Sequence, residues 1–73
     1  MENYRIILIP VEESELFYEF TAPCASPLAA GEYAKVQLTM ASGRYKEARV
    51  MSQWKSELAW RQAIPPIFYN NNL

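Results

Sequence analysis

Four glutamates in the N-terminal third are the first side chains that could carry chemistry. They are Glu12, Glu13, Glu15 and Glu19. Paired carboxylates can act as general acid and general base, but only in a pocket that perturbs their pKa values. Glutamates in a polar turn are far more often solvated, so we interpret them as an exposed, solvated face. The alternative is an acidic patch that attracts a basic partner.

The single cysteine, Cys24, lacks the companions that nucleophilic catalysis needs. The chain contains no histidine to act as its base, and no aspartate to orient a base or to bind Mg²⁺. Its two glycines, Gly31 and Gly43, form no phosphate-binding motif. One cysteine with scattered glutamates does not make a zinc site. The sequence therefore predicts no enzymatic activity, no metal and no cofactor.

Aromatic and basic residues are the remaining candidates, and they suggest binding rather than catalysis. If residues 33–40 and 44–50 form a β-hairpin, four of them share its outer face with Gln37 and Glu47. These four are Tyr33, Lys35, Tyr45 and Arg49. Aromatics mixed with basic residues on a sheet resemble surfaces that stack single-stranded bases. The alternative is an ordinary solvated face with cross-strand pairs.

The two tryptophans are the other binding candidates. Trp54 and Leu58 lie one turn apart on the helix predicted below, whereas Trp60 is rotated about 240° from Trp54, at about 100° per residue. One helix on one sheet buries only one such face well. Either the core wraps around the helix, or one tryptophan is an exposed anchor for a partner, as interface hot spots often are.

Two strands are expected to precede these residues. Residues 4–11 (YRIILIPV) are apolar on both faces, which is typical of a central strand, and Pro10 should lie at an edge or a bulge. Residues 15–21 (ELFYEFT) alternate, with Leu16, Tyr18 and Phe20 on one face. We expect the two to form a hairpin, followed by a loop over residues 23–31 with a short helical turn near residues 28–30.

A second hairpin is predicted from the alternation in residues 33–40 (YAKVQLTM). A three-residue loop over residues 41–43, with Gly43 in the left-handed conformation, would lead into a return strand over residues 44–50. This register places Ala48 and Val50 on the inner face. A two-residue loop would instead mix the two faces.

A helix and a last short strand complete the predicted order. Ser52 is a suitable N-cap, residues 53–63 are good helix formers, and Pro65 would end the helix. Residues 67–69 could form a short strand, and residues 69–73 a frayed tail. The order strand-strand-strand-strand-helix-strand predicts a mainly β (α+β) fold. It would be a small twisted antiparallel sheet, or a small barrel of the SH3 type, with one C-terminal helix.

Residues 30–52 also resemble the first hairpin of Tudor-type small barrels. The resemblance rests on a glycine before a strand, a short turn with glycine, and an aromatic followed by A-x-V on the return strand. The matching residues are Gly31, Tyr45, Ala48 and Val50. It covers about a third of the chain and implies a small barrel, but no function, because the caging aromatics of that family have no counterparts that can be assigned.

Length and composition predict one small domain over residues 1–73. The chain is 51% hydrophobic, with a formal net charge of −1, which disfavours disorder and nucleic-acid binding. A domain of this size usually needs a disulfide, a metal or a partner chain, and the sequence supplies neither of the first two. Without a secretory signal or a membrane span, we expect a cytoplasmic location.

We therefore expect a non-enzymatic protein-binding module, such as an accessory, inhibitor or adaptor protein, which is oligomeric and acts through an aromatic surface. The residues expected to carry binding are Trp60, Trp54, Tyr33, Tyr45, Lys35 and Arg49. One alternative is a single-stranded nucleic-acid binder that uses the outer face of the second hairpin. Another is a structural subunit of a viral or mobile-element assembly. A small-molecule pocket between subunits is also compatible with the sequence.

Overall fold

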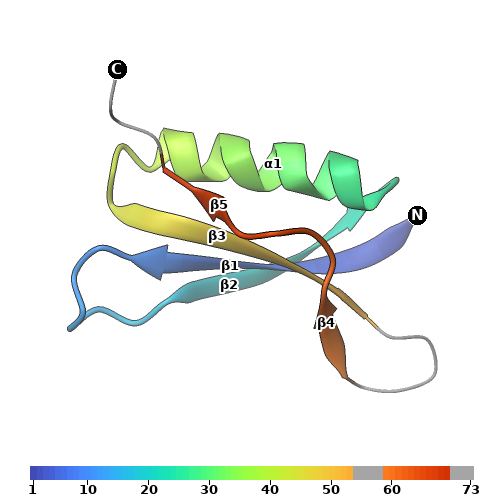
Figure 1. The fold of residues 1–73 in the computed structure, drawn as a ribbon, viewed down its shortest axis with the longest axis horizontal. Helices are drawn as coiled ribbons and strands as arrows, with labels where there is room; N and C mark the ends of the chain where they lie inside the picture. Colours follow the sequence, from blue (N-terminus) through green and yellow to red (C-terminus); the bar gives the residue numbers. More distant parts are fainter. Residues whose placement is uncertain (54–58, 70–73) are drawn as a thin grey trace.

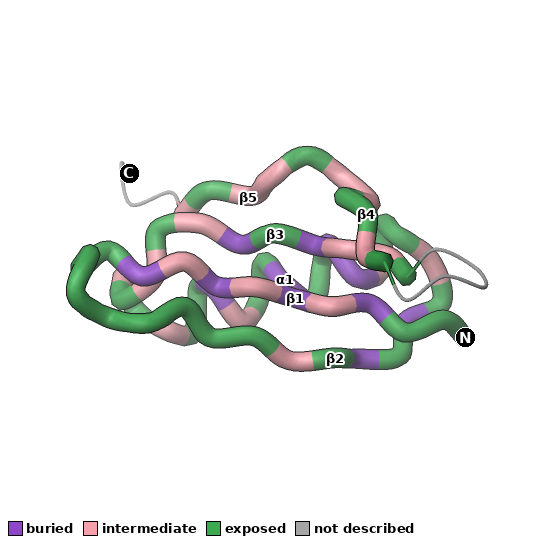
Figure 2. Tube along the Cα trace, turned by 90° about the horizontal axis from the view of Figure 1, so that it is seen from below, coloured by how far each residue is buried: buried purple, intermediate pink, exposed green. Residues whose placement is uncertain are grey.

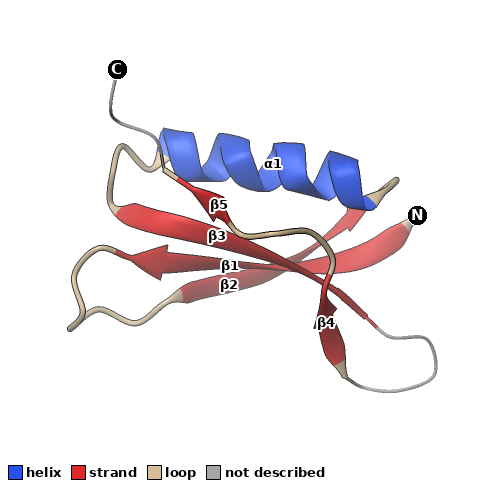
Figure 3. Ribbon diagram, in the orientation of Figure 1, coloured by secondary structure: helices blue, strands red, loops and turns tan. Residues whose placement is uncertain are grey.

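A computed structural model describes residues 1–53 and 59–69 of the chain. One helix covers one face of an antiparallel sheet (Figures 1 and 3). The elements follow in the order β1 (Glu2–Pro10), β2 (Tyr18–Cys24), α1 (Pro27–Met40), β3 (Tyr45–Gln53), β4 (Trp60–Gln62) and β5 (Ile67–Phe68). The prediction of a small, mainly β sheet with one helix is confirmed, but the sheet is open and the predicted barrel is not seen.

Strand β1 lies in the middle of the sheet, as its two apolar faces predicted. It pairs antiparallel with β2 on one side and with β3 on the other. Its register with β3 shifts between Ile9 and Pro10, where the proline can offer no N–H to the ladder. Figure 2 shows the three long strands side by side, with buried positions alternating along β1.

The predicted hairpin of the first two strands is confirmed, although β2 begins and ends three residues later than expected. The predicted alternation placed the even-numbered residues of this strand on one face. This is confirmed, because Phe20, Ala22 and Cys24 face the helix side of the sheet. Leu16 and Tyr18 continue this phase, but both are exposed. Cys24 is thus a buried strand residue and not a loop residue.

Helix α1 replaces the predicted strand over residues 33–40 and much of the loop before it. Ser26 caps its start by accepting a hydrogen bond from the Ala29 N–H at 3.1 Å, and Pro27 occupies the first helical position. The buried face contains Ala30, Ala34 and Leu38, spaced four residues apart. The strand prediction was wrong because the apolar residues also recur at every second position, which left the alternation ambiguous.

The loop after α1 keeps one predicted feature in a different context. Gly43 has a positive φ of 84°, as expected, and its neighbour Ser42 has a φ of 56°. This loop connects a helix to a strand, so the second hairpin and its register are wrong. Strand β3 pairs with β1 instead, and Ala48 and Val50 are fully buried on the helix side.

The predicted C-terminal helix is also wrong where the structure describes it. Gln53 ends β3 and residues 60–62 form β4, which pairs with β3 from Met51 to Gln53. The sequence has good helix propensity here, but pairing with β3 outweighs it. Trp54 and Leu58 lie outside the described residues. The final strand is confirmed as β5, which pairs with β3 at Glu47 and Ala48.

The core lies between α1 and the sheet, and it is thin. Its largest fully buried side chains are Ile6, Leu38 and Val50. Four of its ten buried hydrophobic residues are alanines, which let the helix approach the sheet closely. No helix in the described part of the chain is long and apolar enough to cross a lipid bilayer.

Candidate functional site

The five predicted binding residues that the structure describes do not form one surface. Tyr33 and Lys35 lie on α1, and Lys35 is exposed on the outer side of that helix. Tyr45 begins β3 and lines a pocket on the helix side of the sheet. Arg49 is one residue from the buried Ala48 and Val50, so it lies on the opposite face. These four side chains therefore offer no common surface on which bases could stack.

Trp60, in β4, contacts a basic side chain of the central strand β1. It is half-buried, and the Arg5 guanidinium lies 4.9 Å from the centre of its ring. The same guanidinium forms an ion pair with Glu19 at 3.2 Å. Arg5 thus links β4 to β2 across the uncovered face of the sheet. Trp54, the other tryptophan, lies outside the described residues.

The predicted glutamates are dispersed around the first hairpin. Glu19 pairs with Arg5, and Glu15 lies 4.0 Å from Arg44, at the limit for an ion pair. Glu12, Glu13 and Glu15 border a pocket of about 230 Å³ together with Lys46. Among the described residues, no cluster of three metal-binding side chains occurs. Cys24 has no histidine base, because the chain contains none.

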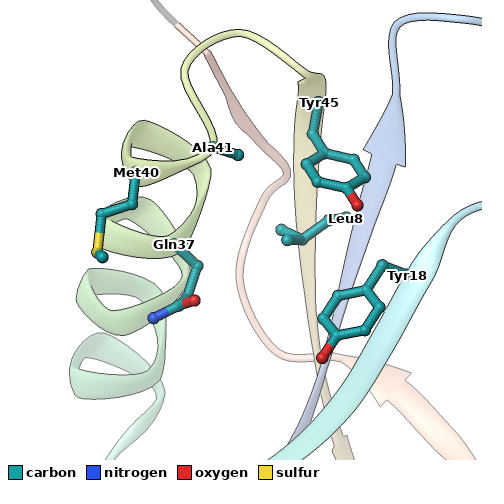
Figure 4. Close-up of a pocket in the computed structure, with 6 residues that line it drawn as sticks. All are labelled: Leu8, Tyr18, Gln37, Met40, Ala41 and Tyr45. Carbon is teal, nitrogen blue, oxygen red and sulfur yellow. The ribbon is translucent and has the colours of Figure 1, made fainter.

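A different region stands out in the structure, namely the gap between α1 and β2. Two open pockets lie along it. The first, which we call the tyrosine pocket, has a volume of about 250 Å³. Leu8, Tyr18 and Tyr45 project into it from three strands, beside the end of α1 (Figure 4). Its lining residues are Leu8, Tyr18, Gln37, Met40, Ala41 and Tyr45.

The second pocket, which we call the cysteine pocket, has a volume of about 410 Å³ and is more apolar. Its lining residues are Met1, Ala22, Pro23, Cys24, Ala25, Ala29 and Tyr33. An edge-to-face contact between Phe20 and Tyr33, with ring centroids 6.1 Å apart, joins β2 to α1 between the two pockets. The pockets therefore flank Phe20 on the same face of one strand.

Within the described residues, β2 pairs only with β1 and is therefore one edge of the sheet, which we call the free edge. The directions of its backbone N–H and C=O groups follow from the pairing of the neighbouring strands. The Ala63 N–H donates to the Val50 carbonyl at 2.8 Å, so the backbone groups of Val50 point away from β1. In antiparallel sheets these directions alternate. Ile6, opposite Val50, therefore bonds to Phe20 of β2. It follows that the N–H and C=O groups of Glu19 and Thr21 point outward from the edge.

Pro23 fits the same pattern. It lies two residues beyond Thr21, so its nitrogen also faces outward, where the missing N–H costs the β1–β2 ladder nothing. Edge prolines limit pairing with other chains. Here the proline limits it at one end only and leaves Glu19 and Thr21 open.

Exposed apolar side chains surround this edge. Leu16 is 89% exposed and Tyr18 is 55% exposed, although both are large. Met1, at the rim of the cysteine pocket, is 93% exposed. Two of the predicted binding residues, Tyr33 and Tyr45, line the pockets. The sequence analysis did not predict the free edge of β2. It placed residues 33–40 in a second hairpin, whereas these residues form part of helix α1, which lies beside β2.

Comparison of the chain with protein-family models, with curated proteins and with solved structures found no match.

Proposed function

We propose that this chain is a non-enzymatic protein-binding module that takes an extended segment of a partner onto the free edge of β2. The observation that carries the proposal is the combination of outward backbone groups at Glu19 and Thr21 with two apolar pockets beside them. Strand addition works in this way: backbone hydrogen bonds supply affinity, and pockets for alternate side chains supply specificity.

The two pockets fit the spacing of such a segment. Tyr18 borders one pocket and Ala22 the other, and four residues of extended chain span about 13 Å. An added strand would therefore place apolar side chains four positions apart, one on either side of Phe20. The exposed Leu16 and Tyr18 would lose water contact in the same step, which favours binding.

The thin core supports the proposal as well. A small domain without a disulfide or a metal commonly gains stability from a partner. The chain has one cysteine, and it is free.

The test is site-specific photocrosslinking in the cells that produce the protein. A photoreactive phenylalanine analogue replaces Phe20, which is half-buried at the edge, or, as a control, Leu28, which is exposed on the outer side of α1. We expect discrete protein adducts from position 20 only. Adding Thr21→Pro, which removes one outward N–H and leaves the bonds to β1 intact, should abolish them, whereas Thr21→Val should preserve them.

Adducts that persist with Thr21→Pro, or that form equally from position 28, would contradict this function. So would the absence of any adduct from position 20.

A further inference from the structure

We infer that the partner at this edge is a second copy of the chain, paired antiparallel through β2 about a two-fold axis at Phe20. The inference rests on the proposed function, because it assigns the occupant of the same edge. It follows from the order of residues along β2, which is complementary to itself in this register.

The backbone groups select the register. With the axis at Phe20, Glu19 of each copy faces Thr21 of the other, and both outward groups of both residues are paired. The four hydrogen bonds use every outward group of Glu19 and Thr21. An axis at Thr21 would instead set the Glu19 carbonyl against Pro23, which has no N–H. The Phe20 register is therefore the better of the two.

The side chains agree with this register. Tyr18, large and 55% exposed, would lie opposite the small Ala22 of the other copy, beside its cysteine pocket. The two Phe20 rings would meet at the axis on the helix side, where aromatic cross-strand pairs are favourable. On the opposite face, the exposed Phe17 would approach Pro23 of the other copy. In both pairs, a large side chain of one copy thus lies opposite a smaller side chain of the other.

The charges agree too. Pairing about Phe20 directs the hairpin of one copy, with Glu13 and Glu15, toward residues 25–27 of the other, where α1 begins. The first turn of α1 contains no acidic residue of its own. The positive end of the helix dipole would therefore meet carboxylates from the second copy. Glu19, already paired with Arg5, would face Thr21 and not another glutamate.

The resulting dimer would have one continuous sheet with both helices on the same side. A two-fold axis perpendicular to the sheet keeps each face on its own side, so the two thin cores would join along the β2 edges. The net charge of −1 per chain gives little repulsion between copies.

The first measurement is native mass spectrometry and light scattering over a concentration series. Wild type and Thr21→Val should give a species of twice the 8.4 kDa chain mass, whereas Thr21→Pro should give the monomer. Circular dichroism and urea unfolding of the Thr21→Pro monomer check that its fold is intact. A wild type that stays monomeric, or a Thr21→Pro protein that dimerises normally, overturns the inference.

A disulfide tests the register itself. In a Cys24→Ala background, Phe20→Cys places two thiols in a non-hydrogen-bonded pair at the axis, a geometry that suits a disulfide. Mild oxidation should give a covalent dimer with Phe20→Cys and much less with Thr21→Cys. The reverse result would overturn the Phe20 register.

The crosslinking above separates the two proposals. An adduct of position 20 with the chain itself supports both. An adduct only with a different protein, lost with Thr21→Pro, overturns the second copy as the occupant and leaves the proposed function standing.

Discussion

At the scale of single residues, burial changes the pKa of the Tyr4 phenol. Its ring is packed in the core, with a relative exposure of 2%. Burial, aided by the negative charge of Glu2, raises the pKa of its phenol above the usual value of 10.0. The folded state therefore keeps this proton more firmly than the unfolded chain does.

Alkaline pH should accordingly destabilise the fold through Tyr4. Because the folded-state pKa is raised, its contribution to stability is fully present below pH 10.0 and is lost as pH rises through the folded pKa. Tyr4→Phe should make the alkaline fall in the free energy of unfolding shallower. Urea unfolding at several pH values on either side of this point measures the slope. Equal slopes in both proteins would contradict the assignment.

At the scale of the elements, the start of α1 contains local sequence signals for a helix over residues 27–40. Two local signals act there, the Ser26 cap and Pro27 at the first position. The helix has apolar residues on its outer side too, including Val36 and Met40, so its hydrophobic pattern alone gives it little direction. The Ser26 cap and Pro27 therefore indicate the helix more clearly than its hydrophobic pattern does.

Removing the cap should weaken the whole domain measurably. Ser26→Ala leaves the Ala29 N–H without its side-chain acceptor, at a cost of about 1 kcal/mol in the free energy of unfolding. Ser26→Asp should restore most of this stability, since aspartate is an equally good cap. Ser14→Ala, in the exposed hairpin turn, is the matched control and should change stability by less than about 0.5 kcal/mol.

An element is predictable from the sequence where the residue pattern of its own segment determines its secondary structure. It is less predictable where pairing with distant strands determines it. The strands containing Ile6 and Val50 were predicted, because β-branched runs favour strands in any context. Ala30, Ala34 and Leu38 repeat every four residues, which indicates a helix. The apolar residues of this segment also repeat every two residues, and this pattern led to the strand prediction. A serine–proline pair directly before that segment was the signal that could have resolved it.

The free edge at Thr21 could not be predicted in the same way. Whether a strand lies at an edge depends on which strand pairs with which, and β3 pairs with β1 across most of the chain's length. The contact between Arg5 and Trp60 depends on the same long-range pairing. Of the residues that line the two pockets, only Tyr33 and Tyr45 were predicted as binding residues, from residue type alone.

At the scale of the whole molecule, part of the C-terminal segment packs against helix α1. Ile64, which precedes the two prolines, packs on the core beside α1. A Cβ atom added at Gly31 would lie only 2.7 Å from the Ile64 Cδ1 atom. The glycine thus lets the C-terminal segment approach the helix.

This close approach predicts an energetic coupling between helix α1 and the C-terminal segment. Gly31→Ala adds up to about 1 kcal/mol of helix propensity but forces Ile64 to move. In an Ile64→Val background the clashing methyl group is absent, so Gly31→Ala should be more favourable there by about 0.5–2 kcal/mol. Urea unfolding of the four proteins in this cycle measures the coupling. Additive effects would mean that the segment does not pack on Gly31.

The central position of β1 also dictates an order of events during folding. Its pairing with β2 closes a short loop. Its pairing with β3 can form only after the chain has been synthesised through α1 to β3. Closing the longer loop costs more chain entropy and is slower. On the ribosome, one flank of a strand as apolar as residues 6–9 therefore stays unpaired while the helix is synthesised. We therefore expect the β1–β2 hairpin to form before β3 pairs with β1, and the chain to be most prone to aggregation between these two events.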